Sequence, residues 1–329
     1  MEQPTRRKFL KDSVVTLAAG WSAAPVTGLA SAGEVPRPDR APLKPSPPPA
    51  SPGYPPFALG IILGIGNNPE AAIRKVHDLG MPTCQLQIGY LDDSLVERLG
   101  EALEKYHIVC TALGTSGPGP DVYNFYDGPL TLGIVPPTYR AQRIEKILKF
   151  SDYAKRLNIP AIRIHVGFIP ENPNEILYRE VVEALKQVVS YCRANGQDFL
   201  YETGTETPVT LLRTIEDVGL DNQGANLDTA NLILYGKANP LDSLDVIGPW
   251  VKNMHAKDGL YPTNPRDLGK EVEIPHGLVD FPKIFARLKA LNYRGPVTIE
   301  REISGPEQLA SVRRERDYLR AVLEKEGLA

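Results

Sequence analysis

The 329-residue sequence predicts a single closed (β/α)8 barrel, and three observations lead to this fold class. Apolar strand-like runs alternate eight times with amphipathic helix-like segments over residues 57–329. That region is close in length to the ~250 residues of a typical barrel of this kind. Polar residues at alternate positions of consecutive strands point to one volume, which a barrel provides and a doubly wound sheet does not. We therefore favour the barrel over the doubly wound sheet.

Residues 1–32 resemble a twin-arginine export signal. The pair Arg6-Arg7 precedes a mildly apolar stretch over residues 14–24 and a small-residue cleavage pattern at residues 30–32. We expect cleavage after Ala32 and delivery by the twin-arginine export machinery to the periplasm or another extracytoplasmic compartment. A basic amphipathic helix is the alternative. No apolar run reaches the ~18 residues of a membrane span, so no stable span is expected after processing.

A proline-rich segment separates the signal from the barrel. Residues 33–56 contain ten prolines, which remove backbone donors and favour extended conformations, so we interpret this segment as a disordered linker. The net charge of −3 and the pI near 6.0 do not favour a nucleic-acid partner. Only three cysteines occur and none forms a Cys-x-x-Cys motif, which excludes a thiolate zinc cluster. A disulfide at Cys84 or Cys110 stays open.

Each repeat of the barrel pairs a strand with the helix that follows it. In the first repeat, Asn68-Pro69 is typical of a helix start and Gly80 of a helix end. The same succession of apolar run, turn residues and amphipathic segment marks the other seven. The predicted strands and helices are 57–65 with 71–79, 83–90 with 94–106, 108–115 with 139–157, 161–167 with 175–195, 198–204 with 208–218, 224–229 with 242–247, 251–257 with 281–291, and 296–302 with 307–326.

Polar residues with a two-residue spacing occupy one face of strands four to eight. Parallel strands covered by helices normally read as nearly continuous apolar runs. Because side chains alternate along a strand, the polar ones share a face, which we predict to be the barrel interior near its C-terminal mouth. These residues are Arg163 and His165, Glu202, Asn226 and Asp228, Asn253, His255 and Lys257, and Thr298, Glu300 and Glu302.

A metal site is the first interpretation of this cluster. Carboxylates that converge in a restricted cavity repel one another unless a cation neutralises them. Three oxygen ligands and one imidazole favour Mn²⁺, Mg²⁺ or Co²⁺, and also allow Zn²⁺ or Fe²⁺. The alternative is a buried ion-pair network with countercharge from Arg163, Lys257 and Arg301. The candidate ligands, one from each of strands five to eight, are Glu202, Asp228, His255 and Glu300.

Four segments resemble motifs of the xylose-isomerase-like barrel family of sugar isomerases and epimerases. They are Tyr201-Glu202-Thr203-Gly204, residues 226–232, residues 254–259 and residues 295–302. The resemblance covers roughly residue 57 to the C-terminus. It implies that the four candidate ligands bind one divalent ion and that Glu202 and Glu300 serve as acid and base.

Two positions depart from the family pattern. Pro275-His276-Gly277 stands where relatives commonly have Gly-Glu-Gly, so His276 is either a substrate contact or a solvated loop residue. Asn231 stands where epimerase relatives place a histidine that touches the substrate. This second departure puts their particular substrate in doubt for this chain.

The resemblance implies an isomerase or epimerase that acts on a ketose or keto-sugar derivative through an enediolate. Two glutamates on opposite faces of the substrate would invert a carbon, whereas one base acting on one face would move the carbonyl. A structural role as partners of the buried carboxylates is the alternative for the surrounding polar residues. The predicted substrate-binding residues are Arg163, His165, Lys257, Asn231 and Glu206.

The long loop over residues 115–138 is expected at the barrel mouth. Its residues Tyr123, Phe125 and Tyr126 could stack on a sugar as a lid or pack against neighbouring helices.

Three other functions are alternatives to the isomerase or epimerase. A dehydratase or lyase on a keto-sugar or keto-inositol needs the same metal and base, and it differs only in the product. An exported sugar-binding protein would not need converging carboxylates. A repair endonuclease needs more histidine ligands and a basic groove, against which the five histidines and the acidic chain argue. The substrate, the native ion and the oligomeric state stay open.

Overall fold

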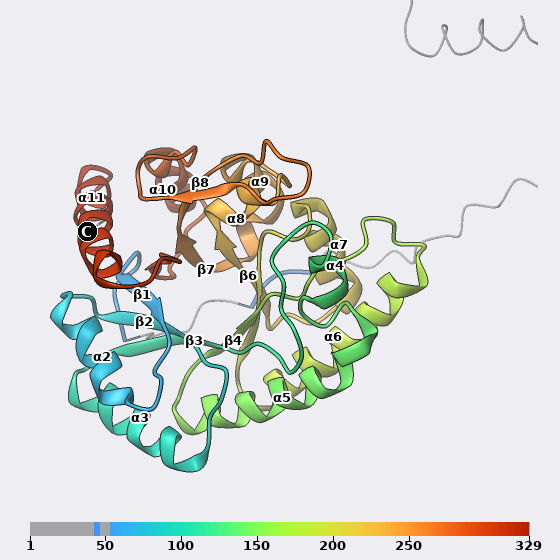
Figure 1. Ribbon diagram of the computed structural model, residues 1–329, viewed down its shortest axis with the longest axis horizontal. Coiled ribbons are helices and arrows are strands. Elements are labelled where there is room, and N and C mark those ends of the chain that lie inside the picture. The colour runs from blue at the N-terminus through green and yellow to red at the C-terminus, as the bar shows by residue number, and fades with distance from the viewer. Residues whose placement is uncertain (1–42, 47–52, 329) are drawn as a thin grey trace, which may run out of the picture. The chain divides into compact units, whose positions relative to one another are not determined.

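The computed structural model describes residues 43–46 and 53–328. Eight parallel strands close into a barrel in the order β1-β10-β7-β6-β5-β4-β3-β2, with helices on the outside (Figure 1). The predicted (β/α)8 fold is therefore confirmed. The predicted signal at residues 1–32 lies outside the described residues, as does most of the predicted linker. Among the described residues, no helix is long and apolar enough to cross a membrane.

The first half of the barrel follows the predicted repeats. Its helices bury one apolar stripe each, as in α2, where Ile73 and Val76 face the core and Asn68 caps the start by accepting from the Ala71 amide at 3.0 Å. The elements are β1 (Leu59–Leu63), α2 (Pro69–Asp78), β2 (Thr83–Gln87), α3 (Asp93–Lys105), β3 (Val109–Gly114), α4 (Gly128–Thr131), α5 (Pro137–Arg156), β4 (Ala161–Ile164) and α6 (Ile176–Ala194).

The second half contains shorter helices and one hairpin. Helix α7 begins after Thr207, whose side chain accepts from the Thr210 amide, and ends at Gly219 in the left-handed region. The elements are β5 (Asp198–Glu202), α7 (Pro208–Val218), β6 (Gln223–Asp228), α8 (Thr229–Leu234), α9 (Pro240–Ile247), a 3-10 turn (Gly248–Trp250), β7 (Val251–Ala256), β8 (Asp258–Leu260), β9 (Lys270–Val272), α10 (Phe281–Ala290), β10 (Val297–Ile299) and α11 (Pro306–Lys325).

Several boundaries differ from the sequence prediction. All eight barrel strands end before their predicted ends, so that several polar residues expected in strands belong to the loops; Lys257 and Glu300 both follow a strand end. The prediction assigns no element to residues 258–280, but β8 and β9 pair there as an antiparallel hairpin. Helices α4 and α8 were not predicted, because four and six residues are too few to show a helical period.

The barrel wall separates an apolar outer layer from a polar interior. Outward side chains of the strands pack with the helices in one large apolar cluster. Ala112, Ala161 and Leu200 form a separate small apolar cluster. Buried Gln85 and Asn226 contribute polar side chains to the interior. The three cysteines are buried and free, so Cys84 and Cys110 do not form a disulfide.

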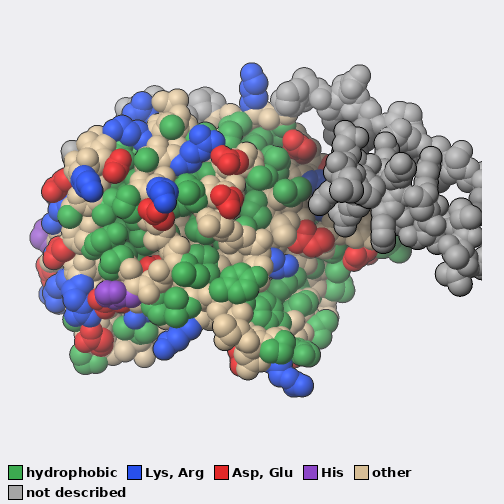
Figure 2. Space-filling view, turned by 90° about the horizontal axis from the view of Figure 1, so that it is seen from above, with side chains coloured by type: hydrophobic (Ala, Val, Ile, Leu, Met, Phe, Trp, Pro, Cys, Tyr) green, Lys and Arg blue, Asp and Glu red, His purple; other side chains and the backbone are tan. Residues whose placement is uncertain are grey.

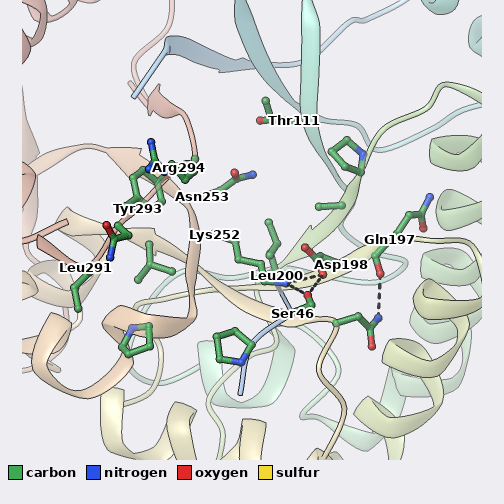
Figure 3. Close-up of a pocket in the computed structure, with 18 of the residues that line it drawn as sticks. Ser46, Thr111, Gln197, Asp198, Leu200, Lys252, Asn253, Leu291, Tyr293 and Arg294 are labelled. Atoms are coloured by element: carbon green, nitrogen blue, oxygen red, sulfur yellow. Dashed lines mark hydrogen bonds and ion pairs between the residues drawn. The ribbon is translucent and has the colours of Figure 1, made fainter. Parts of the chain in front are cut away.

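Residues 43–46, a described part of the predicted linker, contact the base of the barrel. Ser46 donates its amide to the Asp221 carbonyl at 3.0 Å, and its hydroxyl accepts from Lys252 Nζ at 2.6 Å. Lys252 also pairs with Asp198 at 2.7 Å (Figure 3). A cavity of about 540 Å³ lies beside these contacts, lined partly by Tyr293. Residues 43–46 are therefore packed against the end of the barrel opposite its C-terminal mouth.

Charged residues of both signs are distributed over the surface. On the face drawn in Figure 2, acidic and basic side chains lie interspersed among apolar ones. Such a mixed surface, like the net charge of −3, does not favour a polyanionic partner.

Candidate metal centre

The four candidate ligands meet at the C-terminal ends of β5, β6, β7 and β10. Their ligand atoms all lie within 4.8 Å of one another. His255 Nδ1 is 3.1 Å from Glu202 Oε1, 3.1 Å from Glu300 Oε2 and 3.6 Å from Asp228 Oδ2. The register of adjacent strands explains this convergence, because Asp228 is paired with His255 and Thr298 is paired with the same histidine from the other side.

The unpaired atoms of the cluster fit a divalent cation. Glu202 Oε1 and Asp228 Oδ2 are both buried, and neither has a hydrogen-bond partner among the described residues. Unpaired carboxylate oxygens cost several kcal/mol when buried, unless a cation occupies the space between them. Three carboxylates and one imidazole form a set of oxygen and nitrogen donors that divalent ions accept. The side chains present therefore could hold one metal ion.

Local hydrogen bonds fix the direction of two ligands. Asp228 caps α8, since its Oδ1 accepts from the Asn231 amide at 2.7 Å and leaves Oδ2 facing the cluster. Glu202 is oriented by Arg163, whose Nη1 contacts Oε2 and leaves Oε1 facing His255. Each carboxylate thus presents one oxygen to the centre and keeps the other on a protein partner.

Burial and charge act in opposite directions on two of the carboxyl groups. Burial raises the pKa of Asp228 to about 6, against the attraction of Lys257. Burial alone would also raise the pKa of Glu300, but the positive charge of Lys257 and the contact with His255 lower it well below its ordinary value. Glu300 is therefore ionised at neutral pH.

Two of the predicted substrate-binding residues stand on β4 and just after it. Arg163 also donates from Nη2 to Gln87 Oε1 at 2.6 Å. His165 Nε2 lies 3.4 Å from Glu202 Oε1. Burial and the neighbouring Arg163 lower the pKa of His165 to about 3, so this ring is neutral at physiological pH.

Lys257 and Asn231 lie together on the opposite side of the cluster. Lys257 Nζ is 3.3 Å from Glu300 Oε2, 2.9 Å from Glu302 Oε1 and 3.2 Å from Asn231 Oδ1. Burial would lower the pKa of Lys257, but Glu300 and the other carboxylates raise it well above its ordinary value. Asn231 therefore contacts the ammonium group that pairs with Glu300.

The structure does not bring Glu206 and His276 to the cluster. Glu206 is buried and accepts from the Thr205 hydroxyl at 2.8 Å; over the described residues it has no hydrogen bond or ion pair with the four candidate ligands. His276 is exposed in the loop after β9. The role predicted for Glu206 in substrate binding stays a prediction, and the solvated position of His276 agrees with its simpler interpretation.

Two glutamines of β2 join the site, and neither was among the predicted site residues. Gln85 contacts His255, and Gln87 contacts Arg163. They stand two residues apart and share a face with Thr83, while Cys84 and Leu86 lie between them, which is the same alternation that marks strands four to eight. The sequence therefore already contains the signal for these two residues.

The loop over residues 115–138 reaches the site with one of its aromatic residues. The ring centroid of Tyr123 lies 5.9 Å from that of His165 in an edge-on arrangement. Phe125 instead packs against apolar side chains of α8. Arg143, buried on α5, holds the loop by donating to the carbonyls of Pro118, Pro120, Thr131 and Gly133. Phe125 thus agrees with the packing interpretation, whereas stacking of a loop aromatic on a sugar stays a prediction.

Residues 73–322 match the family described as "Xylose isomerase-like TIM barrel". The chain belongs to the xylose isomerase-like TIM barrel family. The resemblance inferred from the sequence motifs is therefore confirmed for the larger part of the chain. No curated protein matches the chain.

Three solved structures share the fold over nearly their whole length. A xylose isomerase domain protein from Planctomyces limnophilus is 29% identical, with a TM-score of 0.78 over 82% of this chain and 99% of its own. A barrel protein from Mycobacterium smegmatis in complex with magnesium is 18% identical, with a TM-score of 0.61 over 84% and 98%. The 3-keto-D-glucoside 4-epimerase of E. coli is 15% identical, with a TM-score of 0.62 over 80% and 99%. The last two show the fold alone.

Proposed function

We propose that this chain is a divalent-metal-dependent sugar isomerase or epimerase that moves a proton with Glu202 and Glu300. One observation carries the proposal: both glutamates face the same cluster, and each is paired with its own cation. Arg163 contacts Glu202, and Lys257 contacts Glu300. Two carboxylates in separate electrostatic environments can differ in proton affinity, which acid–base catalysis requires.

The proposed ion is Mn²⁺, Mg²⁺ or Co²⁺, held by Glu202, Asp228, His255 and Glu300. When bound, such an ion polarises a carbonyl group and stabilises the negative charge that develops on it. The magnesium in the Mycobacterium smegmatis relative supports an ion of this class. Hard divalent ions prefer the oxygen-rich set that the cluster offers.

Glu300 is the residue best placed to take the first proton. It is ionised at neutral pH because Lys257 pairs with it, and its side chain is 12% exposed, whereas that of Glu202 is 1% exposed. A base must reach the carbon next to the carbonyl, so the more accessible carboxylate suits this step. Glu202 is then the partner that returns the proton in an epimerase.

The neutral polar groups around the cluster suit a substrate with several hydroxyls. His165 is neutral and can donate or accept one hydrogen bond, and Lys257 can donate to a substrate oxygen from beside Glu300. Asn231 holds Lys257 from the other side. These contacts support a ketose or keto-sugar derivative, and the epimerase named for the Escherichia relative is a precedent for such a substrate class.

Deuterium exchange tests the proposed proton transfer. A panel of unphosphorylated ketoses and keto-glycosides is incubated with Mn²⁺-loaded protein in D₂O, and mass spectrometry follows deuterium at the carbon next to the carbonyl. Incorporation is expected, because the abstracted proton rests on a carboxylate that exchanges with solvent. Conversion without incorporation contradicts proton transfer through Glu300 and Glu202.

Glutamine variants assign the roles. Glu300→Gln and Glu202→Gln remove the base and keep an oxygen, so exchange should fall by ~10²-fold or more, beyond any loss of metal. The exposed Glu97→Gln is the control and should exchange like the wild type. Full exchange in both variants overturns the assignment. A product that has lost water supports the dehydratase instead, for which the same centre is suited.

A further inference from the structure

The nitrogen of the His255 ring that faces away from the candidate ligands contacts the side-chain amide of Gln85. Gln85 lies on β2, which contributes no candidate ligand. His255 Nε2 lies 2.9 Å from Oε1 of Gln85 on β2. The amide nitrogen of Gln85 donates to Asn226 Oδ1 at 2.9 Å and lies 3.5 Å from Thr298 Oγ1. Gln85 is fully buried, so these contacts replace those it would make with water.

The contact between Gln85 and His255 determines where the imidazole carries its proton. An amide oxygen only accepts hydrogen bonds, so a neutral His255 that meets Oε1 must be protonated on Nε2. Its Nδ1 then carries a lone pair. That lone pair faces Glu202, Asp228 and Glu300 at 3.1 to 3.6 Å, and four electron-rich atoms attract a cation into the space between them.

The amide nitrogen of Gln85 contacts residues of two other strands that also carry candidate ligands. Asn226 stands two residues before Asp228, and Thr298 stands two residues before Glu300. Gln85 thus connects the ring of one candidate ligand to the strands that carry two others. Asn226 Nδ2 has no partner among the described residues, so this side chain can rotate and still satisfy a changed neighbour.

We propose that Gln85 is a positioning residue that keeps the proton of His255 on Nε2 and so prepares Nδ1 for metal binding. The inference rests on the metal centre of the proposed function and adds a residue to it. If the amide pointed the other way, its NH₂ group would donate to Nε2. The proton would then lie on Nδ1 and form a hydrogen bond with Glu300, and His255 would be lost as a ligand.

Three variants separate positioning from simple loss of packing. Gln85→Met keeps the size of the side chain and removes the acceptor. Gln85→Glu keeps an acceptor for Nε2–H, and Asn226 can rotate to donate to the new carboxylate. Thr83→Val is the matched control: Thr83 lies on the same strand, is fully buried, and its hydroxyl donates to the Leu59 carbonyl at 3.2 Å and to no other group of the described residues.

Equilibrium dialysis of the full chain with Mn²⁺ is the first measurement. We expect the Kd of Gln85→Met to rise about 10- to 100-fold, as for other groups that orient a metal ligand. Gln85→Glu should stay within about threefold of the wild type, as should Thr83→Val. Thermal melts by circular dichroism in EDTA show whether each variant folds. If Gln85→Met does not fold, the Kd of Gln85→Glu tests the proposal, and a value outside the expected threefold range contradicts it.

Long-range ¹H–¹⁵N correlation spectra provide the second measurement and need no activity. In wild-type protein, with Zn²⁺ and without metal, His255 should show the Nε2-protonated tautomer. In Gln85→Met without metal, a substantial Nδ1-protonated fraction should appear. If the wild type and Gln85→Met bind Mn²⁺ with the same Kd, the proposed role of Gln85 is wrong. A wild type that binds no divalent ion overturns the metal centre itself.

Discussion

Glu206 is a buried carboxyl group whose titration should govern stability near neutral pH. It is 3% exposed, and the Thr205 hydroxyl is its one hydrogen-bond partner among the described side chains. Burial raises the pKa of Glu206 from 4.5 to about 7. The folded protein therefore holds this proton more tightly than the unfolded chain does.

The sign and the size of the effect follow from the two pKa values. Because the folded-state pKa is the higher one, the contribution to stability is complete below about pH 4.5 and is lost as the pH rises through about 7. The difference between these values corresponds to about 3 kcal/mol, an upper figure for one buried carboxyl group.

Glu206→Gln removes the titration and keeps an oxygen that can accept from Thr205. The difference between the free energy of unfolding of the variant and that of the wild type should increase by about 3 kcal/mol in favour of the variant between pH 4.5 and pH 8. The assay is urea unfolding in EDTA, followed by circular dichroism at half-unit pH steps. Glu97→Gln, on the exposed side of α3, is the control and should follow the wild type at every pH.

Parallel stability curves for wild type and Glu206→Gln would refute this reasoning, because they mean that Glu206 titrates equally in folded and unfolded chains. The same variant also tests the substrate contact predicted from the sequence. A loss of turnover at a pH where both proteins are folded would support that contact. Unchanged turnover would leave Glu206 with a role in stability alone.

Three further outcomes are expected. His255→Ala should reduce bound Mn²⁺ from about one ion per chain to a small fraction, whereas Asn253→Ala should reduce it far less; equal metal contents by elemental analysis would exclude the histidine as a ligand. Replacing Arg6 and Arg7 by lysine should retain the protein in the cytoplasm, as cell fractionation would show, and unchanged export would contradict a twin-arginine signal. Lys252→Met removes the contacts of Lys252 with Asp198 and Ser46 at the barrel base and should cost about 1 to 2 kcal/mol in urea unfolding, and no change would mean that these two contacts add nothing to stability.

The sequence by itself determined the fold class and the polar face of the barrel. Both depend on the spacing of apolar and polar residues along the chain, which repeats about every 3.6 residues in a helix and every two in a strand. The two-residue spacing of Asn226 with Asp228, and of Asn253 with His255, already placed these side chains on one face. Family motifs added the expectation that four such residues act together, and the structure brings the four within reach of one ion.

Short elements and boundaries could not be predicted in this way. Helix α8 has six residues and starts because Asp228 accepts a hydrogen bond from the Asn231 amide, so its cap is also a candidate ligand. The β8–β9 hairpin depends on pairing between Asp258 and Val272, and no periodic spacing of residues in the sequence predicts this pairing. Such features arise from single contacts, and those form only when the surrounding chain is in place.

The tertiary structure alone decided which polar groups meet. Gln85 and His255 are 170 positions apart in the sequence, and they touch because β2 and β7 both direct these side chains into the closed barrel, in which only β1 and β10 separate the two strands. Likewise, Ser46 reaches Lys252 across 206 positions at the base. Residue spacing reports the face of a strand to which a side chain belongs. The partner on the other side of the interior depends on the order, tilt and closure of the strands, which are properties of the whole barrel.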